Sequence, residues 1–223
     1  MAEARGKVDD IPLRMPHSAA VAGIVFAVLF ATAIVLVRTA LPDTPPAASP
    51  RVVDDGRIRA AFIIVPFASI AFLWFIGVVR SLLGKLEDRF FSTVSLGSGL
   101  LFLALTSVST AVAGGILATS QRSNLDENGI IYFGRQVVLD INHIYAVRMA
   151  AVFMISLATI WLRTRLMPRW LPLITYPLAL ILLLVLDLSL WAALVFPAWV
   201  LVVSVTILVA NRPESPPALD DIP

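Results

Sequence analysis

Long stretches of this chain carry no charged side chain. Residues 90–121 contain no Asp, Glu, Lys or Arg, and residues 170–210 contain only one, Asp187. Each stretch is longer than the roughly 20 residues of helix that cross the hydrocarbon core of a bilayer. Charged residues make up only 14% of the chain, against about a quarter in soluble domains, which leaves too little polar surface to cover a water-facing globule. The sequence therefore predicts an integral membrane protein.

The expected fold is an all-α bundle of transmembrane helices, because a helix satisfies its own backbone hydrogen bonds in lipid. The charges that bound the apolar stretches predict six spans, at residues 19–37, 60–79, 94–119, 144–162, 170–186 and 190–210. The fourth is difficult to place, since the uncharged residues 149–162 are too short to cross at about 1.5 Å per residue. This span is therefore extended back to Ile144 and contains Arg148. The last two spans are expected to form a hairpin that turns around Asp187.

The distribution of Lys and Arg predicts the orientation of these spans. With the N-terminus inside, ten of the 17 basic residues lie in cytoplasmic segments, six lie in outer segments, and Arg148 lies at the outer end of its span. The positive-inside rule favours this arrangement, so both termini are expected to be cytoplasmic. Residues 1–18 then form an N-terminal segment, 19–210 a single transmembrane domain and 211–223 a disordered, acidic, Pro-rich tail. The first apolar run is longer than that of a secretory signal, so we expect an uncleaved helix.

Two ionisable residues fall inside or beside the predicted spans, Arg148 and Asp187. A charge in hydrocarbon costs several kcal/mol unless it is paired or reaches the interface, so such residues are the first functional candidates. The predicted topology places both near the outer boundary, where they could pair or form a polar pocket with Asp140, Asn142 and His143. The alternative is that Arg148 extends to the headgroups and that Asp187 is a solvated turn residue.

The third span carries small and hydroxyl side chains at a spacing of four residues. One row contains Thr106, Thr110, Gly114 and Ala118, and the row beside it contains Ser107, Ala111, Gly115 and Thr119. Small residues let two helix backbones approach closely, and hydroxyl groups can bond across the contact. The pattern predicts a helix-packing seam, with a hydroxyl-lined solute path or a contact between copies of the chain as alternatives.

The sequence contains no complete catalytic, metal or cofactor motif. The absence of Cys excludes disulfides, zinc-thiolate sites and iron–sulfur clusters. A catalytic dyad of Ser98 and His143 is rejected, because the topology separates the two side chains across the membrane and a dyad needs a distance of about 3 Å. A haem held by two histidines fails in the same way for His17 and His143. Because no such motif is complete, we expect no enzyme activity and no cofactor. The basic residues form no concentrated patch, so we also expect no nucleic-acid partner.

Three segments resemble a known family. They are residues 86–101 (LEDRFFSTVSLGSGLL), residues 145–154 (YAVRMAAVFM) and the turn at residues 168–171 (PRWL). Together they resemble a family of uncharacterised bacterial multi-pass membrane proteins, from the second span to the last. The resemblance implies a six-helix protein of the bacterial inner membrane. It implies no activity and no site residue.

Two functional hypotheses follow from the sequence. The first is a non-enzymatic structural, accessory or assembly component, whose partners are the lipid bilayer and either further copies of the chain or other subunits of a membrane complex. It depends on the predicted packing seam, the short loops and the missing catalytic motifs. The second is a small transporter or channel with an outer-leaflet polar site around Arg148 and Asp187. A polar cavity that reaches Arg148 would favour the second hypothesis.

Overall fold

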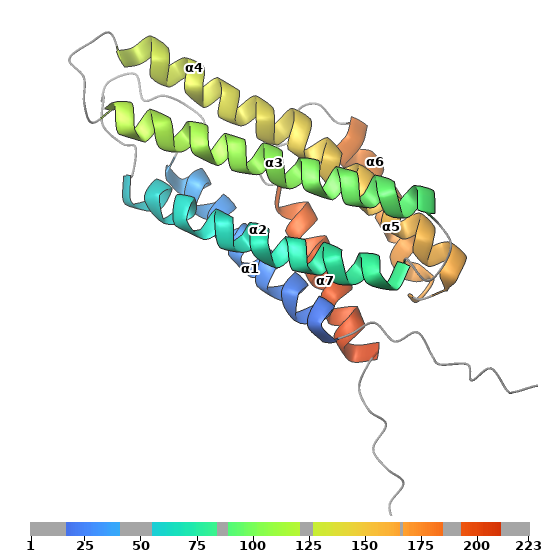
Figure 1. The fold of residues 1–223 in the computed structure, drawn as a ribbon. Coiled ribbons are helices and arrows are strands. Elements are labelled where there is room, and N and C mark those ends of the chain that lie inside the picture. Colours follow the sequence, from blue (N-terminus) through green and yellow to red (C-terminus); the bar gives the residue numbers. More distant parts are fainter. Residues whose placement is uncertain are drawn as a thin grey trace, which may run out of the picture.

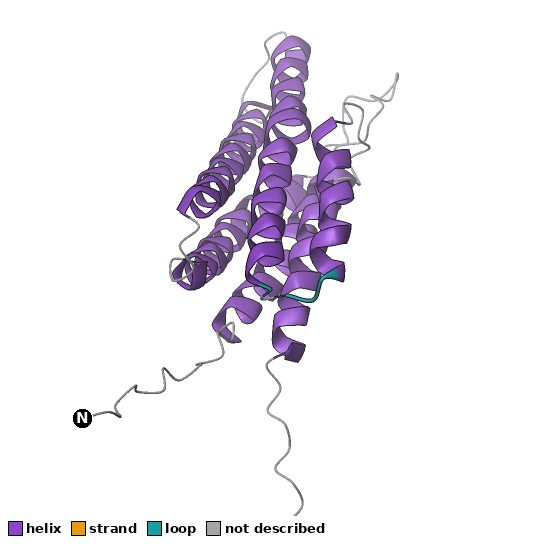
Figure 2. Cartoon of the chain, turned by 90° about the vertical axis from the view of Figure 1, so that its right-hand side faces the viewer, coloured by secondary structure: helices purple, strands orange, loops and turns teal. Residues whose placement is uncertain are grey.

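The computed structural model describes residues 17–40, 55–83, 89–120, 127–165, 167–184 and 193–210. Every secondary-structure element within these ranges is helical, and a short loop joins α5 to α6 (Figure 2). The all-α prediction is therefore confirmed for the described part of the chain. The predicted tail at residues 211–223, nearly all of the N-terminal segment and Asp187 lie outside the described residues.

The elements follow one another as an antiparallel bundle (Figure 1). In chain order they are α1 (His17–Ala40), α2 (Asp55–Leu83), α3 (Arg89–Ser120), α4 (Glu127–Asp140), the π-helical turn η1 (Ile141–Ala146), α5 (Val147–Thr164), α6 (Trp170–Leu184) and α7 (Val195–Ala210). The backbone keeps right-handed helical dihedral angles through Asp140, Ala146 and Val147. The α4, η1 and α5 elements therefore form one uninterrupted helix, called the long helix below.

Within the described ranges, four helical segments are long and apolar enough to cross a membrane. They are His17–Val37, Gly56–Ser81, Phe90–Ile116 and Phe133–Thr164. The first three contain most or all of the spans predicted at 19–37, 60–79 and 94–119. The long helix begins at Glu127 rather than near Ile144, because its N-terminal part packs along α3 instead of forming a loop. The apolar helices α6 and α7 are shorter, with 15 and 16 residues.

Packing between helices assembles an aromatic core from five of them. The helix α1 packs on α2 and α7, α3 packs on α2 and on the long helix, and α6 packs on α5. Phe72 of α2 lies at the centre, with its ring centroid 4.5 Å from Phe26 and 5.4 Å from Phe153. The aromatic core comprises Phe26, Phe30, Phe72, Phe75, Phe102, Phe153, Phe196 and Trp199, all of them buried.

The outer surface of the bundle is apolar, and its interior contains hydroxyl groups. Trp74 is 70% exposed and Phe133 is 71% exposed, and all of the α-helices present large apolar side chains to their surroundings. In contrast, Ser98, Ser109 and Thr175 are buried between helices. Apolar side chains outside and hydrogen-bonding hydroxyl groups inside are typical of helices that pack in lipid.

Candidate functional site: a cavity at the π-helical turn

The long helix contains six residues of π-helix in its middle. At the end of this turn the backbone N–H of Val147 donates to the carbonyl of Asn142, five residues back, instead of the usual four. A π-turn adds a residue to the helical repeat and changes the direction in which the neighbouring side chains point. Such turns are rare, and they occur frequently at functional sites. This turn carries Asn142 and His143.

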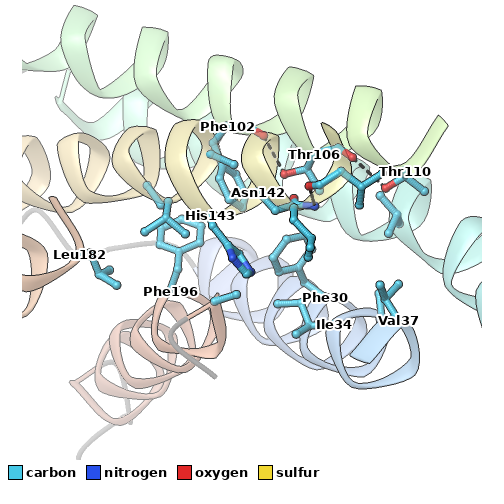
Figure 3. Close-up of a pocket in the computed structure, with 18 residues that line it drawn as sticks. Phe30, Ile34, Val37, Phe102, Thr106, Thr110, Asn142, His143, Leu182 and Phe196 are labelled. Carbon is cyan, nitrogen blue, oxygen red and sulfur yellow. Dashed lines mark hydrogen bonds between the residues drawn. The ribbon is translucent and has the colours of Figure 1, made fainter. Parts of the chain in front are cut away.

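A cavity of about 110 Å³ lies beside this turn (Figure 3). Residues from all seven helices and from the π-turn line it, so it occupies the inside of the bundle and not a single helix–helix groove. Its lining is mainly apolar. Phe30, Phe102 and Phe196 form part of its wall and belong at the same time to the aromatic core.

Four polar residues form the remaining wall of the cavity, called the polar wall below: Thr106, Thr110, Asn142 and His143. The Thr106 Oγ1 donates to the carbonyl of Phe102 at 2.8 Å, and the Thr110 Oγ1 donates to the carbonyl of Thr106 at 2.7 Å. Each hydroxyl proton is therefore committed to its own helix, and the lone pairs of both oxygens remain available as acceptors.

The amide of Asn142 is held by two partners. Its Nδ2 donates to the carbonyl of Val138 at 3.0 Å and to the Oγ of Ser109. The Ser109 hydroxyl in turn donates to the same Val138 carbonyl at 3.3 Å. A carbonyl can only accept, so this bond determines which end of the amide is the nitrogen. Both amide protons are used, and the Oδ1 of Asn142 is left as an acceptor.

His143 projects from the long helix toward α1 (Figure 3). Its ring is half-buried and lines the cavity together with Phe30 and Phe196. In the neutral form, an imidazole carries one donor nitrogen and one acceptor nitrogen. His143 therefore adds a side chain to the polar wall that is able both to donate and to accept.

Arg148 is half-buried and connects two helices through backbone oxygens. Its Nη1 donates to the carbonyl of Ile144 at 2.9 Å, and its Nε donates to the carbonyl of Leu183 in α6 at 3.4 Å. It is not one of the residues that line the cavity. The pairing with Asp187 stays a prediction, since Asp187 lies outside the described residues.

The other candidates from the sequence occupy separate places. Asp140 accepts a hydrogen bond from Gln136 at 2.9 Å and does not line the cavity. Ser98 is buried in α3 and donates to the carbonyls of Val94 and Ser95. Within the described ranges, His, Asp and Glu side chains form no group of three that could hold a metal ion.

The two rows of the predicted seam face different surroundings. Thr106 is buried, and Gly114 lies so close to α2 that a Cβ there would come within 2.8 Å of the Phe62 ring. Ser107, Ala111 and Gly115 are exposed. The first row therefore supplies close α2–α3 packing at Gly114 and polar lining at Thr106 and Thr110, while the second faces outward.

Sequence reasoning did not find the apolar wall of the cavity. Phe30, Phe102 and Phe196 lie in different predicted spans, and each looks like ordinary membrane-facing sequence. It did name Asn142 and His143 together, and it named Thr106 and Thr110 as a row. It had no signal that the π-turn would bring these two groups to one cavity.

Comparisons with protein-family models, with curated proteins and with solved structures found no match to this chain.

Proposed function

We propose that this chain is a six-helix integral membrane protein of the bacterial inner membrane, with both termini in the cytoplasm. We propose further that it acts as a non-enzymatic structural, accessory or assembly component of that membrane. The observation that carries the second statement is the position of Arg148. This arginine links the π-turn to α6 through the carbonyls of Ile144 and Leu183, and it does not face the cavity.

The membrane setting is supported by the distribution of side chains over the bundle. Four segments are long and apolar enough to cross, and large apolar residues such as Trp74 and Phe133 cover the outside. The proposed six-span topology counts the shorter apolar helices α6 and α7 as the fifth and sixth spans. The resemblance of residues 86–101 and 145–154 to bacterial multi-pass proteins supports the same setting.

The absence of Cys from the sequence allows a direct test of topology. Single Cys variants at Ser49, Ser123, Ser189 and Ser215 each carry one thiol, which a membrane-impermeant maleimide labels only from its own side. We expect the first three to react in intact cells and Ser215→Cys to react only after the membrane is opened. Labelling of Ser215→Cys in intact cells would contradict the proposed topology.

The accessory role is tested by the mass of the protein in its native surroundings. The chain is extracted from its own membrane in mild detergent and measured by native mass spectrometry. We expect a fixed stoichiometry, either with further copies of the chain or with another membrane protein. A monomer that carries only lipid would contradict the accessory role.

A second candidate function is a small transporter or channel, and one observation favours it. Asn142 and His143, both named from the sequence as part of an outer polar site, line a cavity inside the bundle. In the proposed topology this cavity lies in the outer half of the membrane. If the chain conducts small neutral solutes, proteoliposomes should take up glycerol faster than empty liposomes in stopped-flow light scattering, and Asn142→Leu should slow the uptake. Equal rates with and without the protein would rule out this solute path.

A further inference from the structure

The size of the cavity sets the size of its occupant. A volume of about 110 Å³ is somewhat smaller than the roughly 150 Å³ of an engineered apolar cavity that binds benzene and stays dry. The space inside the bundle is therefore about as large as one six-membered ring.

The apolar wall is suited to a flat ring. Phe102 lies 4.7 Å from Phe196 and 5.4 Å from Phe30 between ring centroids, in edge-to-face arrangements. These rings are buried and held by Phe26 and Phe72 behind them. Edge-to-face contacts are the preferred geometry for aromatic groups, so a further ring can pack against this wall without rearranging it.

The polar wall is rich in acceptors. The hydroxyl protons of Thr106 and Thr110 are donated to carbonyls of α3, and both amide protons of Asn142 are donated to Val138 and Ser109. Three oxygen atoms with available lone pairs remain there. A ligand that donates a hydrogen bond therefore finds a partner among these three oxygens. For a ligand that only accepts, the one side chain of the polar wall whose protons are not assigned to these bonds is His143.

The described lining of the cavity favours a neutral ligand. None of the Asp, Glu, Lys and Arg residues that the structure describes lines the cavity, and burial of a charge without an opposite charge costs far more than burial of a neutral polar group. We propose that this cavity binds a neutral molecule of about one ring that carries a hydroxyl group, such as a simple phenol or cyclic alcohol. Its O–H donates to Thr106, Thr110 or Asn142, and its ring packs against the phenylalanine wall. This inference does not depend on the function proposed above.

The test uses three fluorinated rings of similar size. The protein is reconstituted in nanodiscs, and saturable binding is followed by ¹⁹F NMR for 3-fluorophenol, which donates and accepts, for 3-fluorotoluene, which does neither, and for 3-fluoropyridine, which only accepts. Empty nanodiscs supply the baseline for partition into lipid. We expect saturable binding of 3-fluorophenol, and we expect that an equal concentration of 3-fluoropyridine does not displace it.

Variants of the polar wall separate the donor contact from simple filling of a void. In Thr106→Val with Thr110→Val, the affinity for 3-fluorophenol should fall about tenfold, the value of one hydrogen bond. The affinity for 3-fluorotoluene should stay the same or rise. The matched control is Thr32→Val, because Thr32 also donates to a carbonyl four residues back, at 2.8 Å, but is exposed and lies away from the cavity. This control should leave both affinities unchanged.

Filling the cavity tests the location of the site. Ala193 lines the cavity and is half-buried, so Ala193→Leu should abolish saturable binding of all three rings. Absence of saturable 3-fluorophenol binding to the wild-type protein would overturn the proposal. So would displacement by 3-fluoropyridine at equal concentration, or an equal loss of 3-fluorotoluene affinity in the threonine variants. The first two outcomes need no variant to fold.

Discussion

The aromatic core and the cavity are neighbours in the same bundle. Side chains fill the space between the helices in the core, whereas part of that space is left open at the cavity. In the core, Phe26, Phe72 and Phe153 meet with centroid distances of 4.5 and 5.4 Å, and each ring is buried. In the cavity, Phe30, Phe102 and Phe196 are packed by those rings on one side and face open space on the other. The same helices therefore form both the closely packed core and the open cavity.

The treatment of polar groups also differs between the two regions. Within the described residues, the Nε1 of Trp161 and the Oγ of Ser204 are buried without a hydrogen-bond partner, and both lie on helices of the packed region. Around the cavity, Asn142 donates to Ser109, which in turn donates to the Val138 carbonyl. Thr106 and Thr110 each donate to a carbonyl of their own helix. The packed region also contains bonded polar groups, because the Nε1 of Trp199 donates to the Oγ1 of Thr175 at 2.9 Å. The difference between the regions is therefore that the two unpartnered groups lie in the packed one.

The largest expected effect comes from removing the ring at the centre of the core. Phe72→Ala should lower the free energy of unfolding by about 3–5 kcal/mol, because it leaves a void among rings that pack only on one another. The matched control is Phe67→Ala on the same helix, since Phe67 is 61% exposed. This control should change stability by less than about 0.5 kcal/mol. Unfolding in detergent, followed by circular dichroism, gives both values. An equal loss of stability in the two variants would show that the ring of Phe72 contributes no more to the fold than an exposed phenylalanine.

A smaller effect is expected at Gly23, where α1 packs against α7 and α2. A Cβ added at Gly23 would overlap the Ser204 Oγ and come within 3.0 Å of Phe75. Gly23→Ala should therefore destabilise the protein by about 1–3 kcal/mol, the usual cost of overpacking. Adding Ser204→Gly should recover part of this loss, because it removes the nearest atom. No recovery in the double variant would mean that the Phe75 contact dominates.

Filling should have opposite signs in the two regions. Ala193→Leu places atoms into the cavity and should stabilise the protein by about 0.5–2 kcal/mol. Ala68→Leu makes the same change at a fully buried core position and should destabilise it by about 1–3 kcal/mol. Thermal unfolding of both variants in the same detergent measures the contrast. Stability lost in both variants would show that the cavity collapses and is not a preformed space.

The smallest effect concerns single hydroxyl groups. Ser204→Ala removes a buried oxygen that has no partner, so it should raise stability by up to about 1 kcal/mol. Ser109→Ala is the counterpart beside the cavity, where it removes an acceptor of the Asn142 amide. This variant should lower stability by about 1–2 kcal/mol, because it leaves a polar proton without its bond. Equal signs for the two variants would contradict the difference between the regions.

Much of the helix content could be predicted from uncharged length alone, but the fourth helix could not. Its predicted start at Ile144 followed from the uncharged run at 149–162, which is too short to cross and was therefore extended back past Arg148. In the structure the helix continues back to Glu127, because α4 packs along α3 and Asp140 bonds to Gln136 on its own helix. Charged residues in a sequence therefore indicate where a helix leaves the lipid, but the helix itself can continue beyond them.

Part of the candidate site was predictable as well. Asn142 and His143 were named from the sequence as neighbours of Arg148 at the outer boundary. Thr106 and Thr110 were named for their spacing of four residues, as part of a packing seam. The role of Arg148 was not predictable. Its partners are the carbonyls of Ile144 and Leu183, and a sequence does not show which carbonyls lie within reach of a guanidinium.

The sequence by itself determined which segments are apolar and helical, and that the chain contains no thiol. Those properties depend on residue type and local spacing, which hydropathy and helix periodicity express directly. Only the tertiary structure decided that the long helix contains a π-turn, that rings from separate helices form one wall, and that the threonine row and Asn142 form the other. These features depend on contacts between residues far apart in the chain, where the shape left between packed helices, and not the composition of any one of them, determines whether space is filled or left open.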